Sequence, residues 1–256
     1  MKNPQRRIAF AALAFAGLAA VTGAQAWSWT FGSGERIKGS GEVGSEARTP
    51  GGFDAIQLSG SFKVQVRQAA SDSVEVRAEK NLLPYIETRI VDGGKGGKTL
   101  EITTKKGFQL AGTQPVQISI GMIVLRSLAV DGSGDVRVEG MKTPSLDAAI
   151  AGSGDIRLQE LFSEKVGFKV AGSGDIYAKG RTNSLTISVA GSGDVKAAEL
   201  ASDEVSVKIA GSGDAQVQAN KALKVSIAGS GDVRYLGSPE ISSSVAGSGS
   251  IKRLNN

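Results

Sequence analysis

The sequence repeats the motif Asp131-Gly-Ser-Gly-Asp135 as Ala-Gly-Ser-Gly-Asp at 151–155, 171–175, 190–194, 210–214 and 228–232, and closes with Ala-Gly-Ser-Gly-Ser at 246–250. The first Gly of each copy stands at 132, 152, 172, 191, 211, 229 and 247, so the intervals are 20, 20, 19, 20, 18 and 18 residues. A period held this closely over seven copies indicates one structural unit stacked on itself. The motif therefore says more about architecture than about chemistry.

The residues on either side of each turn alternate between apolar and polar. Val166, Phe168 and Val170 precede the third turn, and Ile176 and Ala178 follow it. Period two with β-branched residues on one face is typical of strands with one buried face. The repeat region shows no useful stretch with a helical period of 3.6 residues, so we predict an all-β fold.

Two arrangements of a unit of ~20 residues remain open, a meander of antiparallel hairpins and one coil of a parallel β-helix. In the hairpin arrangement each turn reverses the chain. In the coil each strand pairs with its counterpart one repeat later, and identical turns stack at the strand spacing of ~4.8 Å. We favour the coil, because independent hairpins give no reason to keep six copies of one pentapeptide.

The turn residues have separate roles. Two Gly residues two positions apart allow a sharp corner, because Gly adopts positive φ at no steric cost. Ser and Asp side chains can accept backbone N–H bonds locally, in place of ladder bonds that the corner interrupts.

In a coil the acidic side chains of the turns would form a column of carboxylates ~4.8 Å apart. This aspartate column consists of Asp135, Asp155, Asp175, Asp194, Asp214 and Asp232. Each carboxylate either accepts N–H bonds at its own corner and stays solvated, or the column binds Ca²⁺, as Gly/Asp-rich β-rolls do. We favour the first hypothesis, because the β-roll motif has a nine-residue period and supplies more oxygen ligands than one Asp per coil.

The chain before the repeats divides into segments of different composition. Lys2, Arg6 and Arg7 precede an apolar run from Ile8 to Val21, and Ala24-Gln25-Ala26 then fits the small-x-small cleavage pattern of an export signal. The predicted organisation is a signal peptide at 1–26, a flexible Gly/Ser-rich lead-in at 27–52 and one β-solenoid domain at 53–256. In that domain 53–125 would be irregular opening coils and a cap, with Ser59-Gly60-Ser61 as a degenerate corner, and 126–256 the regular repeats. A separate small β domain at 53–125 is the alternative.

Composition narrows the possible functions. The formal charge is +5, and removal of three basic residues with the signal would leave 5 − 3 = +2. This near-neutral balance, without a cluster of basic residues between aromatics, makes nucleic acid an unexpected partner. The chain has no Cys and no His, which excludes disulfides, thiolate metal sites and the commonest general base. We predict no transmembrane segment once the signal is removed.

The sequence resembles a known bacterial family in three places: Phe53-Asp-Ala-Ile56, Asn81-Leu-Leu-Pro-Tyr-Ile-Glu-Thr88 and the repeated Gly-Ser-Gly-Asp. The family is the putative auto-transporter adhesin, head GIN domain family of secreted proteins, and the similarity covers roughly residues 53–250. The resemblance implies a right-handed parallel β-helix at the cell surface or in the periplasm. It implies no catalytic residues.

Together these features predict an exported, non-enzymatic protein of the cell envelope, an adhesin or interaction scaffold whose partner is an envelope protein or polysaccharide. We predict no catalytic, cofactor-binding or metal-binding residues.

The alternative is a carbohydrate-binding or carbohydrate-cleaving module, for which 93–97 and 105–113 are the only loops long enough to shape a groove. Tyr177 and Tyr235 are the candidate sugar-stacking residues. A mildly basic outward face, read as ordinary solvation, would contain Lys169, Lys179, Lys196, Lys208, Lys224 and Arg234. A short basic stretch at 251–256 would discourage the last strand edge from pairing with another chain.

Overall fold

The computed structural model describes residues 34–93 and 97–254, so the predicted signal and the first part of the lead-in lie outside it. The strands in chain order are β1 (Glu35–Lys38), β2 (Val43–Arg48), β3 (Ala55–Ser59), β4 (Lys63–Gln68), β5 (Ser73–Glu79), β6 (Ile86–Asp92), β7 (Lys98–Thr104), β8 (Phe108–Ala111), β9 (Gln117–Met122), β10 (Ser127–Gly132), β11 (Asp135–Gly152), β12 (Asp155–Gly172), β13 (Ile176–Gly191), β14 (Val195–Gly211), β15 (Ala215–Gly229), β16 (Val233–Leu236), β17 (Glu240–Gly247) and β18 (Ile251–Arg253). A 3-10 turn, η1 (Leu83–Tyr85), precedes β6. In the described ranges no helix is long and apolar enough to cross a bilayer.

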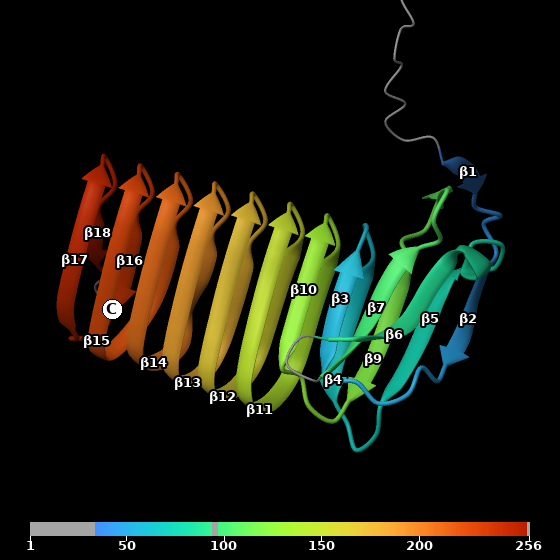
Figure 1. Cartoon of the computed structure of the whole chain (residues 1–256), viewed down its shortest axis with the longest axis horizontal. Coiled ribbons are helices and arrows are strands. Elements are labelled where there is room, and N and C mark those ends of the chain that lie inside the picture. The colour runs from blue at the N-terminus through green and yellow to red at the C-terminus, as the bar shows by residue number, and fades with distance from the viewer. Residues whose placement is uncertain (1–33, 94–96, 255–256) are drawn as a thin grey trace, which may run out of the picture. The chain divides into compact units, whose positions relative to one another are not determined.

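The repeats form successive coils of a parallel β-solenoid (Figure 1). Each coil pairs in parallel with the next, and the first Gly of each turn lies opposite the first Gly of the next turn from Gly132 to Gly247. The predicted parallel β-helix with coils of about 20 residues is therefore confirmed, and the hairpin meander is excluded. Register shifts occur away from the Gly-Ser-Gly turns, between Leu158 and Leu161, Tyr177 and Lys179, Ala197 and Ala201, and Ser202 and Glu204.

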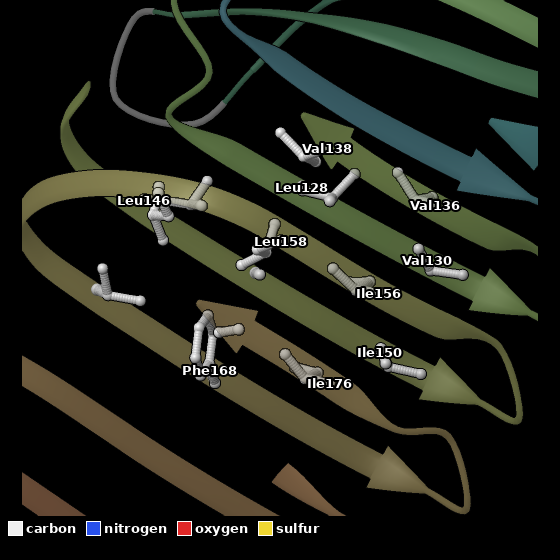
Figure 2. Close-up of a cluster of buried hydrophobic side chains, with 14 of the residues drawn as sticks. Leu128, Val130, Val136, Val138, Leu146, Ile150, Ile156, Leu158, Phe168 and Ile176 are labelled. Carbon is white, nitrogen blue, oxygen red and sulfur yellow. The ribbon is translucent and has the colours of Figure 1, made fainter. Parts of the chain in front are cut away.

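Each coil sends alternate side chains inward along three straight runs. In β11 the inward residues are Val136 and Val138 in the first run, Met141 and Thr143 in the second, and Leu146, Ala148 and Ile150 in the third. Two successive outward residues separate the runs, at Glu139-Gly140 and Pro144-Ser145. Figure 2 shows Val136, Ile156 and Ile176, which share one register position, projecting into the same interior. The alternation read from the sequence is thus the alternation between core and solvent.

Hydroxyl groups occupy one inward position of the second run. Thr143, Ser163, Thr182 and Ser202 lie opposite one another in successive coils. The hydroxyl of Thr143 donates to the carbonyl of Ser145 at 3.1 Å, and that of Thr182 donates to Ser184 at 3.1 Å. Because a buried hydroxyl without a partner would destabilise the fold, these local bonds let polar residues stand in the core row.

The Gly-Ser-Gly turns are bonded to one another through a shared acceptor. The carbonyl of Gly172 accepts the N–H groups of Ser192 at 2.9 Å and of Gly193 at 3.1 Å in the next coil. Gly172 has a φ of 131°, and a Cβ there would lie 2.3 Å from the carbonyl oxygen of Gly152. A Cβ on Gly174 would lie 2.1 Å from the equivalent oxygen of the preceding coil. The first Gly is therefore required by its backbone angle and by contact, and the second by contact alone.

The opening of the solenoid has a spatial order that differs from its chain order. β3 and β4 pair in parallel with β10 and β11, whereas β7 and β9, later in the chain, stack on the far side of β3 and β4. Ser59-Gly60-Ser61 forms the corner between β3 and β4, and the Gly60 N–H donates to the Asp131 carbonyl at 3.0 Å. Gly60 also has a positive φ of 125°. The degenerate corner predicted here is confirmed.

Antiparallel strands finish this end of the stack. β6 pairs with β7, β5 with β9, and β2 with β5. The prediction of a flexible lead-in up to residue 52 is wrong for the described part, because 34–52 contains β1, which pairs with β8, and β2. These strands are mostly exposed and are held by backbone ladders, so their sequence shows no apolar alternation.

Glu79 joins the loops of this antiparallel end. Its side chain is buried, and its carboxylate accepts the N–H groups of Gly41, Thr113 and Gln114. These hydrogen bonds, foremost the one from Gly41, lower the pKa of Glu79 despite the opposing effect of burial. Sequence reasoning did not find this role, since Glu79 looks like an ordinary polar residue at a strand end.

The turn geometry predicts a large difference between two neighbouring substitutions. Gly172→Val should lower the free energy of unfolding by at least about 2 kcal/mol, because a β-branched residue resists positive φ and its Cβ would meet a carbonyl oxygen. Ser173→Ala should change it by less than about 0.5 kcal/mol, because that side chain is exposed. Urea denaturation of both variants measures the difference, and equal midpoints would contradict the assignment of the corner.

Candidate functional site: a polar depression beside the aspartate column

The aspartate column is bonded along the stack. Oδ1 of Asp155 accepts the N–H of Asp175 at 3.2 Å, and Oδ1 of Asp175 accepts the N–H of Asp194 at 3.0 Å. The same bond recurs up to Ser250, whose N–H donates to Asp232 at 3.0 Å. The prediction that each carboxylate binds at its own corner is therefore wrong, because in-register stacking brings the N–H of the next coil to it.

Cations bind the second oxygen of these carboxylates. Lys196 Nζ lies 2.9 Å from Asp175 Oδ2 and 3.6 Å from Asp194 Oδ2, and Arg234 bridges the next two carboxylates at 3.2 and 3.3 Å. A calcium ion on this column would have to displace these side chains. Within residues 34–93 and 97–254 no group of three or more His, Cys, Asp or Glu is placed to hold a metal. The absence of a metal site on the column stays a prediction.

The two tyrosines proposed as sugar-stacking residues are both engaged. The Tyr177 ring lies between Arg157 and Lys196, with the guanidinium carbon 4.9 Å and the ammonium nitrogen 4.7 Å from its centroid. Its hydroxyl donates to Asp175 Oδ2 at 3.1 Å. Tyr235 is partly buried and packs against the core. Both rings therefore contact other parts of the fold, and their role as sugar-stacking residues stays a prediction.

The basic residues expected on one face lie on two. Lys196 and Arg234 belong to the first runs and pair with the aspartate column, and Lys179 pairs with Glu199 at 2.8 Å. The other three, Lys169, Lys208 and Lys224, are exposed on the third runs among small hydroxyl side chains. We name this second surface the serine face, defined by Ser145, Ser184, Thr186, Ser188, Ser206, Ser226, Ser242 and Ser244.

Asp135 is the exception in the column. No hydrogen bond or ion pair occupies its carboxylate among the described residues, because the Asp155 N–H donates to the Gly134 carbonyl at 3.2 Å instead. Asp135 lines a depression of about 470 Å³. The polar side chains around this depression are Lys63, Gln65, Gln117, Ser119, Asp135, Arg137, Glu139 and Arg157.

Three adjacent strands supply the floor of this depression. Asp135 of β11 lies opposite Lys63 of β4, which lies opposite Gln117 of β9. A second outward row, two residues further along, consists of Arg137, Gln65 and Ser119. Neighbours within a row are ~4.8 Å apart, and the rows are ~6.6 Å apart. We name this surface the polar depression.

The polar depression has hydrogen-bonding capacity that the fold does not use. Lys63, Gln65, Gln117 and Ser119 are exposed, and the structure shows no hydrogen bond from their side chains. Arg137 makes only a loose contact of 3.9 Å with Glu139. The rest of the column, by contrast, is saturated by the next coil and by cations. Charged groups of both signs and uncharged hydrogen-bonding groups therefore face solvent together in one place.

Sequence reasoning did not find the polar depression. Its side chains come from 63–65, 117–119 and 135–139, which become neighbours only because the coil of β7 and β9 stacks beyond the coil of β3 and β4. In 63–65 and 117–119 apolar residues alternate with outward Lys, Gln or Ser, which is the pattern of any strand with one face in solvent. The one usable signal was that Asp135 belongs to the first full copy of the turn, where the column begins.

Hydrogen bonds shift the pKa values of two carboxyls in the column. Burial raises the pKa of Asp175, but hydrogen bonds from Lys196 and from the Asp194 N–H outweigh it and lower that pKa overall. The Ser250 hydroxyl and N–H lower the pKa of Asp232. The hydrogen bond to Asp175 in turn raises the pKa of Lys196. These shifts stabilise the charged forms, so the column is a structural ion-pair network.

These features define the class of protein as a parallel β-solenoid whose aspartate column is bonded from one coil to the next. Residues 52–239 match the family described as "Putative auto-transporter adhesin, head GIN domain". The chain belongs to this family, as the resemblance indicated. A search of curated proteins returns no match.

Solved structures have the same fold. A "putative adhesin" from Bacteroides fragilis NCTC 9343 is 24% identical with a TM-score of 0.77, covering 85% of this chain and 100% of that chain. A "putative lipid binding protein" from Parabacteroides distasonis ATCC 8503 is 29% identical with a TM-score of 0.73, covering 86% and 100%. A "putative adhesin" from Parabacteroides merdae ATCC 43184 is 24% identical with a TM-score of 0.69, covering 86% and 100%.

The pKa shifts predict a loss of stability in acid. Asp175 and Asp232 have folded pKa values below the unfolded value of ~3.9, so their contribution is fully present above that pH and is lost as the pH falls through the folded values. The urea midpoint should therefore fall steeply below about pH 4. In the double variant Asp175→Asn/Asp232→Asn the urea midpoint should fall less steeply with decreasing pH.

Asp147→Asn is the matched control, because Asp147 is exposed and its carboxylate makes no hydrogen bond in the structure. This variant should keep the slope of the unmodified protein. An identical acid slope in the double variant would contradict the role of the column.

Proposed function

We propose that this protein is a non-enzymatic adhesion protein of the cell envelope that binds polysaccharide in the polar depression. The proposal rests on a contrast in hydrogen bonding within the aspartate column. Asp135 and its neighbours are free, whereas the carboxylates from Asp155 onward are saturated. Membership of an adhesin family supports an exported or cell-surface location for this activity.

The chemistry of the polar depression suits a polyhydroxylated ligand. The Asp135 carboxylate can accept two hydroxyl groups, while Arg137, Gln65 and Gln117 can donate to ring and hydroxyl oxygens. Charges of both signs favour a neutral or weakly charged sugar over a nucleic acid, which needs a continuous basic surface. The polar side chains project from the outward faces of adjacent strands, so a polymer can pass across them without threading through a loop.

We expect binding without cleavage because of the positions of the acids. Asp135 and Glu139 are the two carboxylates that line the polar depression. Four residues apart on an extended strand, their Cα atoms are separated by ~13 Å, and because side chains stand roughly perpendicular to a sheet, the two carboxyl groups start from a similar separation. Glycosidases hold their two carboxyls about 5–9.5 Å apart across the scissile bond. The same protein should therefore release no reducing ends from a polysaccharide that it retains.

Two matched aspartates separate binding from folding. Asp135→Ala should reduce retention on insoluble envelope polysaccharide at least tenfold and shift the urea midpoint little, because its carboxylate has no partner in the fold. Asp194→Ala should leave retention unchanged but cost about 1 kcal/mol or more of stability, because the Asp214 N–H loses its acceptor. Co-sedimentation and urea denaturation give the two readouts.

Competing ligands form the other arms of this experiment. The similar protein from Parabacteroides distasonis is named as a putative lipid binding protein, so vesicles of anionic phospholipid are tested beside the polysaccharide. Binding to vesicles but not to polysaccharide would overturn the proposal. So would polysaccharide retention that is lost in Lys169→Ala/Lys208→Ala/Lys224→Ala but unaffected by Asp135→Ala, because it would place the ligand on the serine face.

A further inference from the structure

The last coil leaves one long strand edge unpaired. β17 pairs with β15 only, and no other described strand lies along its second edge. All eight residues of β17 are exposed. Ile241 and Val245, which occupy the inward register positions above Leu223 and Ile227, are 42% and 43% exposed. Core side chains and backbone hydrogen-bonding groups are thus presented together at this end.

β17 lacks the features that protect other edges. Charged residues stand on the outer strands of the opposite end, as Glu46 and Arg48 on β2 and as Glu87 and Arg89 on β6. Such charges discourage pairing with another chain. From Ile241 to Gly247 β17 has no charged residue and no proline. The basic stretch predicted to blunt this end covers only the neighbouring strand, β18, with Lys252 and Arg253.

We propose that β17 pairs antiparallel with β17 of a second copy, joining two solenoids end to end. The segment Ile241-Ser-Ser-Ser-Val245 reads almost identically in both directions. If the two-fold axis passes beside Ser243, Ile241 of one copy faces Val245 of the other, and each Ser243 faces its own equivalent. Because strand side chains have period two, this register keeps all three positions on the core side in both copies.

The symmetry of this contact limits the assembly to two chains. A two-fold interface uses the same surface on both subunits and is closed by a single pairing. The opposite end of the described solenoid carries charged edges, so it offers no second site of this kind. The dimer would extend one apolar core across both copies and leave the polar depression free in each. Its failure would therefore not affect the proposal for sugar binding.

Cysteine cross-linking tests the register, because the chain contains no Cys. Ser243→Cys should form a disulfide-linked dimer under mild oxidation, since the Cα atoms of directly opposed antiparallel residues lie about 4.5–5.5 Å apart, within the range that a disulfide spans. Ser226→Cys, exposed one coil away on β15, is the matched control and should stay at least tenfold less cross-linked. Equal cross-linking of the two variants would overturn the proposal, because it would report random collision.

Sedimentation equilibrium tests the interface without any cross-link. The unmodified protein should have twice the monomer mass at about 100 µM, where a dimer with a Kd of about 1 µM is almost fully formed. Ile241→Lys/Val245→Lys should be monomeric with an unchanged circular dichroism spectrum. Ile123→Lys/Phe162→Lys, which alters side chains that are 55% and 52% exposed elsewhere, should remain dimeric. A monomeric unmodified protein, or a dimer unaffected by the β17 substitutions, would overturn the proposal.

Discussion

The structure depends on one repeated contact, in which the carbonyl of the first Gly in a turn accepts two N–H groups from the next turn. The Gly172 carbonyl accepts the N–H groups of Ser192 and Gly193 in this way. The Cα of the first Gly lies so close to the carbonyl of the preceding turn that no Cβ fits. Because this contact fixes the register at one corner, variation in coil length has to be absorbed elsewhere. The register shifts lie in the first two runs of the coils, whereas the third run, which leads into the next turn, keeps its register.

Stacking also decides which polar groups the protein can offer to a partner. An in-register column of aspartates would repel itself, by slightly under ~1 kcal/mol per neighbouring pair in water. The fold offsets this by bonding each carboxylate to the next coil and to cations such as Lys196 and Arg234. Only at Asp135, where regular repeats meet the opening coils, is the pattern interrupted. A binding surface thus arises at a boundary of the repeat and not within it.

The sequence predicted the repeat region well because its turns and alternation are local signals. Gly172 and the run from Val166 to Val170 specify a corner and a buried face without help from distant residues. The opening coils could not be predicted in the same way. β9 lies beside β4, and the exposed strand β2 is held by a backbone ladder with little apolar pattern. The polar depression depends on that stacking order, so its members, such as Gln65 and Gln117, gave no signal.

The most direct measurement is a set of distances along the stack between nitroxide labels on the exposed turn serines. With one label at Ser133 and the other at Ser212, Ser230 or Ser248, in-register stacking predicts separations of about 19, 24 and 29 Å, a rise of ~4.8 Å per coil. Pulsed electron spin resonance resolves these steps. Distances that fail to rise by one strand spacing from each pair to the next would contradict the account.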